Sequence, residues 1–157
     1  MDFVINEWFL DWYRPDATAA EQKSVRVFFH HFLLSDHKIV VLQNSPFLQK
    51  LHRYRSTFDY DIPCRLALKN FFSTVLQNPE KCVVLQVATA LPSVLESKLL
   101  TGNYASDQYL FQAAQATDDK IIVTTDRKLV EHIGPNEGFN FYNVESFQQT
   151  FLLLPPN

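Results

Sequence analysis

Glycine is scarce in this chain of 157 residues and occurs only at Gly102, Gly134 and Gly138. Loops that bind the phosphates of ATP or of a dinucleotide need clustered glycines, because their backbone must approach the phosphate closely. The three glycines form no such cluster. The sequence therefore argues against a Walker-type loop and against a dinucleotide-binding loop.

Cysteine and long apolar runs are scarce too. Cys64 and Cys82 are the two cysteines, far apart and without Cys-x-x-Cys spacing, and Cys82 is expected to be a small buried side chain. No apolar run approaches the roughly 18 to 20 residues that cross a bilayer. The first residues are acidic where a secretory leader is basic. We therefore expect a cytoplasmic protein with no membrane contact.

The composition is that of a globular protein. Hydrophobic residues make up 46% of the chain and charged residues 20%, with 14 phenylalanines to fill a core. The length fits a single domain over residues 1–157. The net charge of -3 argues against nucleic-acid binding over the whole surface but leaves room for a local basic patch.

Apolar patterns alternate between strands and helices along the chain. We expect strands at 3–5, 38–42, 82–87 and 139–142, and in the run that begins at Ile121. Thr18 and Glu21 form a predicted capping box, and helical stripes follow at 25–33 and 68–76, whereas 52–63 is predicted to be irregular. The expected fold class is α/β, a three-layer sandwich with a central, mostly parallel sheet of four to five strands.

Two aspartates stand out against this pattern. Asp107 opens a helix, and Asp126 follows the buried strand that begins at Ile121. A parallel sheet brings such positions to the carboxyl edge of its strands, where these folds place their sites. Two carboxylates at one edge can hold a divalent cation.

A simpler interpretation exists for both residues, because an aspartate at the start of a helix caps free backbone amides. Asp107, however, shares a helical stripe with the apolar residues Leu110, Phe111 and Ala114. Burying a carboxylate without a partner is costly. A metal ion or a buried hydrogen-bond donor would explain this direction, and together the two aspartates favour a functional site over simple caps.

The run from 106 to 129 resembles the C-terminal half of a PIN domain, a small α/β metal-dependent ribonuclease fold. In that family an acidic residue opens a helix that ends in small residues, and a strand then ends in Thr-x-Asp. The matching residues are Asp107, Ala113, Ala114, Thr124 and Asp126. The resemblance implies catalysis with Mg²⁺ or Mn²⁺, with Thr124 as a polar supporting group.

The N-terminal half departs from the family pattern. The first strand ends Val4-Ile5-Asn6-Glu7, where the family has an aspartate, so either Asn6 has replaced the acid or Glu7 supplies the carboxylate. The helix at 47–51 lacks the family's glutamate, and Gln49 stands roughly at its place. We predict Asp107, Asp126 and Glu7 as the metal ligands. With so few acids, the site either holds a single divalent ion or is catalytically inactive.

Lys50, His52, Arg53 and Arg55 form the most basic local run, with Tyr54 among them. Cations beside an aromatic ring suit RNA, since they bind phosphate and stack on bases. A solvent-exposed charged loop is the alternative interpretation.

Two functions follow from the sequence. The first is a PIN-like, divalent-metal-dependent endoribonuclease that cleaves RNA phosphodiester bonds, in the manner of a toxin–antitoxin toxin. The second is a catalytically inactive PIN-fold protein that binds RNA or a protein. A cognate antitoxin and a homodimer are the expected protein partners.

Overall fold

The computed structural model describes residues 1–153, apart from the side chain of Asn136. In this part of the chain five strands form one sheet in the order β3-β2-β1-β4-β5, and every neighbouring pair is parallel. The strands are β1 (Asp2–Ile5), β2 (Lys38–Leu42), β3 (Cys82–Leu85), β4 (Ile121–Val123) and β5 (Asn140–Tyr142). The predicted α/β fold with a parallel sheet is confirmed.

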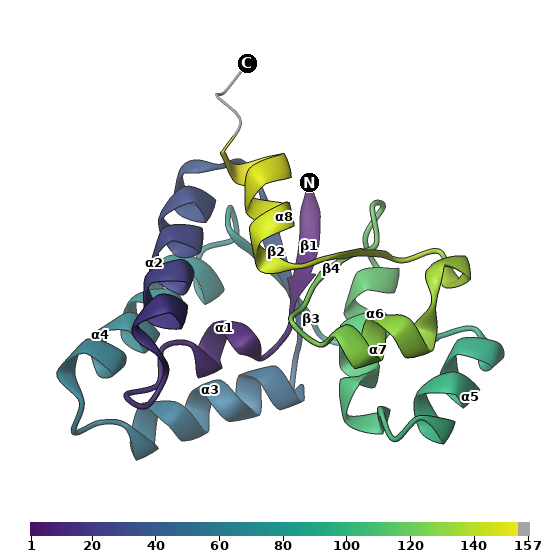
Figure 1. The fold of residues 1–157 in the computed structure, drawn as a ribbon, viewed down its shortest axis with the longest axis horizontal. Helices are drawn as coiled ribbons and strands as arrows, with labels where there is room; N and C mark the ends of the chain where they lie inside the picture. Colours follow the sequence, from purple (N-terminus) through teal and green to yellow (C-terminus); the bar gives the residue numbers. More distant parts are fainter. Residues whose placement is uncertain (154–157) are drawn as a thin grey trace.

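Helices cover both faces of this sheet, with α2 and α4 on one side and α5 and α6 on the other (Figure 1). The α-helices are α1 (Trp8–Asp11), α2 (Ala19–Leu34), α3 (Pro46–Thr57), α4 (Ile62–Phe71), α5 (Ser93–Thr101), α6 (Gln108–Gln115), α7 (Arg127–Ile133) and α8 (Val144–Phe147). Shorter helical turns are η1 (Phe72–Leu76), η2 (Ala105–Asp107), η3 (Pro135–Glu137) and η4 (Gln148–Leu152). None of the helices within residues 1–153 is both long and apolar enough to pass through a bilayer.

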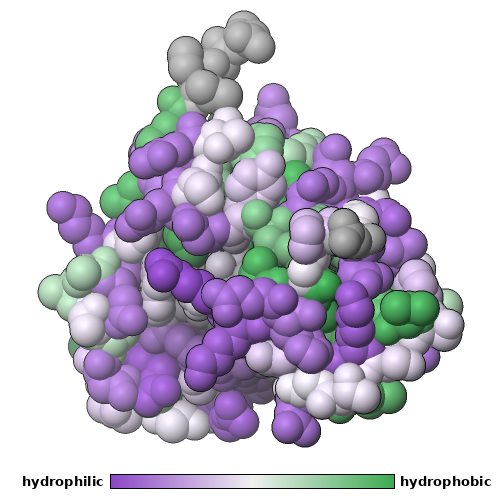
Figure 2. Space-filling model, turned by 45° about the vertical axis from the view of Figure 1, so that its right-hand side comes forward, coloured by the Kyte–Doolittle hydropathy of each residue, from purple (hydrophilic) through white to green (hydrophobic). Residues whose placement is uncertain are grey.

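Phenylalanine rings hold the helices against the sheet. Phe3 of β1 packs edge-on against Phe28 and Phe32 of α2, with ring centroids 6.4 and 5.7 Å apart. Phe9 of α1 meets Phe71 of α4 at 4.7 Å. All five rings are fully buried, so each contributes about 1.5–3 kcal/mol of burial energy. Hydrophilic side chains cover most of one outer face, with apolar atoms gathered in smaller areas (Figure 2).

The α3 helix corrects the prediction of an irregular segment at 52–63, because it continues to Thr57. Ser45 caps its first turn, and the buried side chains of Phe47, Leu51 and Tyr54 recur along one face. Many polar residues on the other face obscured this pattern in the sequence. The third strand is also shorter than predicted: β3 ends at Leu85, and the next residues, Gln86 and Val87, are exposed at the sheet edge.

The predicted capping box at the start of α2 is confirmed. The Thr18 hydroxyl accepts a hydrogen bond from the Glu21 amide, and the Glu21 carboxylate accepts one from the Thr18 amide. Both groups satisfy amides that the helix itself leaves free.

The order of the strands positions the site. β1 and β4 are neighbours, with Ile5 paired with Val123, so the residues after both strands meet at the same edge. The Asn6 amide donates to the Val123 carbonyl oxygen at 3.1 Å, which continues the ladder past the end of β1. Asn6 and Glu7 therefore lie beside the segment Thr124-Thr125-Asp126.

Candidate functional site

Thr124 connects the ends of the two central strands. Its buried hydroxyl accepts a hydrogen bond from the side-chain amide of Asn6 at 3.0 Å and another from the Asp126 backbone amide at 3.1 Å. Thr124 thus fixes the backbone that carries Asp126, and Asn6 fixes the Thr124 hydroxyl. The role of Thr124 as a polar supporting group of a catalytic site stays a prediction.

An acidic cleft of about 470 Å³ opens beside these strand ends. Six carboxylates and one guanidinium line it, from Glu7, Asp11, Asp16, Glu21, Asp107, Asp126 and Arg14. The cleft contains all three acids that the sequence singled out as metal ligands. It also contains acids that sequence reasoning missed, of which Asp11 is the best ordered by hydrogen bonds.

Asp107 shows the electrostatic cost of this arrangement. Its side chain makes no capping hydrogen bond to α6, although it precedes that helix. Partial burial raises the pKa of the Asp107 carboxyl, and the charges of Asp126 and Glu7 raise it further. The charges of Asp126 and Glu7 therefore both repel that of Asp107, and a cation beside Asp107 would relieve this repulsion.

Asp126 fits both interpretations that the sequence left open. Its Oδ1 accepts a hydrogen bond from the Leu129 amide at 2.9 Å, which caps α7. The same residue lines the acidic cleft. Its other oxygen, Oδ2, has no hydrogen-bond partner in the described part of the chain. One oxygen thus stabilises the helix, and the second remains available to a ligand.

Lys50 lies against the acidic cleft from α3. Its ammonium donates to Glu7 Oε2 at 2.6 Å and to Asp11 Oδ2 at 2.9 Å, and the Tyr54 hydroxyl donates to Asp11 Oδ1 at 2.6 Å. Burial opposes the charge of Lys50, but the hydrogen bonds to Glu7 and Asp11 prevail and raise the pKa of its ammonium. The sequence predicted that Lys50 contacts RNA. In the structure its ammonium instead forms ion pairs with Glu7 and Asp11.

The other members of the basic run lie on α3 and not on a loop. His52 and Arg53 are exposed, and the Arg55 guanidinium lies 4.5 Å from the centre of the Phe72 ring. Gln49, at the place where the PIN pattern has an acid, is exposed and donates to the Asn44 carbonyl oxygen. The neighbouring Lys50 is the residue that turns toward the acids.

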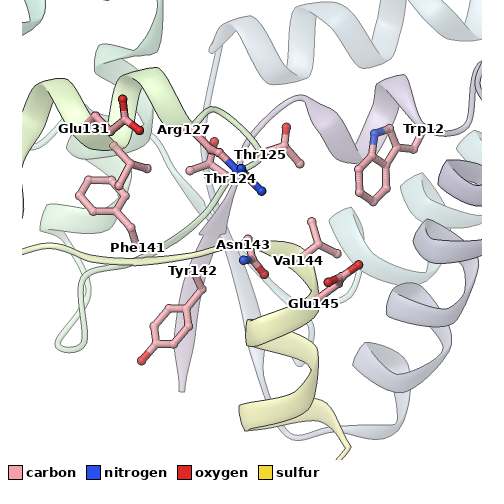
Figure 3. A pocket seen from close by; sticks show the side chains of 11 residues that line it. Trp12, Thr124, Thr125, Arg127, Glu131, Phe141, Tyr142, Asn143, Val144 and Glu145 are labelled. Carbon is pink, nitrogen blue, oxygen red and sulfur yellow. The ribbon is translucent and has the colours of Figure 1, made fainter.

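A second hollow of about 410 Å³ adjoins the cleft (Figure 3). It shares Trp12 and Thr125 with the acidic cleft and extends to Phe141 on the edge strand β5. The side chain of Arg127 lies in the middle of the view, between Thr125 and Asn143. We call this the aromatic hollow, because Trp12, Phe141 and Tyr142 contribute to its walls.

A divalent ion in the acidic cleft would have few protein ligands. Within residues 1–153, no three side chains of His, Cys, Asp or Glu lie close enough together to form a protein-only metal site. Mg²⁺ usually retains several waters and needs only one or two carboxylates. Asp107 and Asp126 supply that number, and both line the same cleft. The donors fit one hydrated ion.

Tyr109 lies on α6, two residues after Asp107, although it is not among the residues that line the cleft. Its side chain is only 6% exposed, and its hydroxyl has no hydrogen-bond partner in the described structure. Burial raises the pKa of the Tyr109 hydroxyl, as do the charges of Glu7, Asp107 and Asp11. A buried hydroxyl without a partner is rare in proteins, and this one lies near enough to three acids of the cleft for their charges to act on it.

The chain matches no model of a known protein family, no curated protein and no solved structure. Its function must therefore be inferred from the geometry of the cleft.

Proposed function

We propose that this protein is a PIN-like endoribonuclease that cleaves RNA phosphodiester bonds with one divalent ion, Mg²⁺ or Mn²⁺. The observation that carries the proposal is the meeting of Asp107 and Asp126 in one cleft at the carboxyl edge of the sheet, where Glu7 joins them. Carboxylates that repel one another at such an edge are suited to binding a cation. The match to the PIN pattern suggests RNA as the substrate.

Each residue has a defined task in this proposal. Asp107 and Asp126 hold the ion, and Thr124 with Asn6 fixes the backbone before Asp126. When bound, the ion supplies an activated water and charge stabilisation at the leaving oxygen. Lys50 holds Glu7 and Asp11 in place.

Cleavage of RNA in the presence of Mg²⁺ or Mn²⁺ tests this function. We expect Asp126→Asn to lower the rate at least about 100-fold, because it removes a charged ligand from the ion. Asparagine caps helices as well as aspartate does, so the fold should be retained. Asp118→Asn, an exposed aspartate next to the other end of β4, is the matched control. Full activity in Asp126→Asn would refute the proposal.

The aromatic hollow is the proposed place for a nucleotide next to the cleaved bond. It continues from the acidic cleft through Trp12 and Thr125, and Arg127 offers guanidinium donors for a phosphate. We expect Arg127→Gln to weaken binding of single-stranded RNA about tenfold, the loss of one charge-assisted hydrogen bond.

Fluorescence anisotropy with Ca²⁺ in place of Mg²⁺ measures this binding. Lys128→Gln is the control, because Lys128 is also exposed on α7 but does not line the hollow. Equal losses in the two variants would show that only net charge matters and would contradict a specific contact by Arg127.

A second function is favoured by the ion pairs of Lys50. Because its ammonium already pairs with Glu7 and Asp11, part of the negative charge of the cleft is neutralised without any metal. This feature suits a catalytically inactive PIN-fold protein that binds RNA or a protein. RNA binding with no cleavage under any divalent ion would favour it. A cognate antitoxin, a homodimer and a cytoplasmic location stay predictions under either function.

A further inference from the structure

Lys50 and its partners form a network between two helices. Glu7 and Asp11 lie one helical turn apart at α1, and Lys50 and Tyr54 lie one turn apart on α3. Every member of the network is at most partly exposed: the side chains of Lys50, Glu7 and Asp11 are 15%, 28% and 36% accessible. The short distances from Lys50 Nζ to both carboxylates therefore describe an ordered pair of ionic hydrogen bonds and not a loose surface contact.

The network divides the acids of the cleft into two sets. Glu7 and Asp11 share the ammonium, whereas Asp107 and Asp126 have no cationic partner in residues 1–153. Glu7 belongs to the first set, and its charge also raises the pKa of Asp107. Of the other two acids of the cleft, Asp16 pairs with Arg14, and the Glu21 carboxylate accepts hydrogen bonds from Thr18. Asp107 and Asp126 are thus the acids of the cleft that remain for a divalent ion, and a second ion would have to displace Lys50 from Glu7 and Asp11.

We propose that the Lys50 ammonium is a permanent counter-ion of the acidic cleft, which limits the cleft to one divalent ion and directs that ion to Asp107 and Asp126. This inference rests on the proposed function, because it assumes that the cleft binds such an ion. Lys50 is thus a residue that determines the number and position of metal ions. It is not itself a ligand of the metal.

Binding of Mn²⁺ followed by electron paramagnetic resonance tests the inference without any RNA. The wild-type chain should bind one ion. Lys50→Gln should bind a second ion, or bind the first about tenfold more tightly, because Glu7 and Asp11 become free to act as ligands. Lys50→Arg keeps the charge and should still bind one ion. Lys69→Gln, an exposed lysine on α4, is the matched control and should behave as wild type.

Glu7→Gln provides the same test if Lys50→Gln does not fold. Because Lys50 already engages Glu7, this variant should change Mn²⁺ affinity less than about threefold, whereas Asp107→Asn should weaken it about tenfold or more. Equal losses in Glu7→Gln and Asp107→Asn would overturn the inference, as would unchanged binding in a folded Lys50→Gln.

The outcomes separate this inference from the proposed function. Two ions in the wild-type chain would overturn the inference alone. One ion without any cleavage of RNA would overturn the ribonuclease and leave the role of Lys50 standing. No binding of Mn²⁺ would overturn both.

Discussion

Replacing Lys50 with glutamine is expected to lower the free energy of unfolding by about 2 kcal/mol when no divalent ion is present. The cost lies between that of a surface ion pair, about 0–1 kcal/mol, and that of a broken buried pair, about 3–5 kcal/mol. An intermediate value follows from the partial burial of Lys50 and its two carboxylates. Urea unfolding in EDTA measures the effect.

Two further measurements define the origin of this loss. Lys69→Gln should change the free energy of unfolding by less than about 0.5 kcal/mol, as expected of an exposed side chain. Addition of Mg²⁺ should restore part of the stability of Lys50→Gln, because the ion replaces the missing positive charge between Glu7 and Asp11. A Lys50→Gln protein as stable as wild type in EDTA would contradict an ordered network.

Replacing Asp107 with asparagine should have the opposite effect and raise the free energy of unfolding by about 1 kcal/mol at pH 7 without metal. The pKa of Asp107 is raised in the folded state, first by burial and then by the charges of Asp126 and Glu7. Its ionised form therefore destabilises the fold at neutral pH. The amide of asparagine carries no charge, its oxygen can still accept the hydrogen bond from Ser106, and Asp107 makes no capping bond that would be lost.

The pH dependence of this gain has a definite sign. A raised pKa favours the folded state fully below the ordinary value of 3.8, and this contribution disappears as the pH rises through the folded-state pKa. Wild type and Asp107→Asn should thus be equally stable at about pH 3 and differ most at pH 7. Urea unfolding from pH 3 to pH 7 tests this, with Asp118→Asn as the control. A variant less stable than wild type at pH 7 would show that the charge of Asp107 is compensated within the protein.

The sequence was sufficient to predict the fold class, because continuous apolar runs such as those of β2 and β4 identify strands buried on both faces. The order of the strands in the sheet could not be predicted from the sequence, because it depends on which face of the sheet each connecting helix covers. The end of α3 was missed for a local reason. Its buried side chains are separated by residues such as His52 and Arg53, whose polarity is typical of a loop.

The candidate site was predictable to a similar extent. Asp107 and Asp126 follow from strand ends and helix starts, and the structure places them in one cleft with Glu7. The pairing of Lys50 with Glu7 and Asp11 was not predictable, because it joins residues 43 and 39 positions apart through the crossing of α3 over α1. The spacing of Glu7 and Asp11 by one helical turn was the signal available, and it required knowledge of the four-residue helix α1.

The claim on which the proposed function depends is that Asp107 and Asp126 together bind a divalent cation. Titration of Mn²⁺ at pH 7 into the wild-type chain and into the Asp107→Asn, Asp126→Asn double variant, followed by calorimetry, tests it most directly. We predict one ion for the wild-type chain and no measurable binding for a folded double variant, in which the asparagine at position 126 retains the cap of α7. The same binding in both proteins would contradict the account.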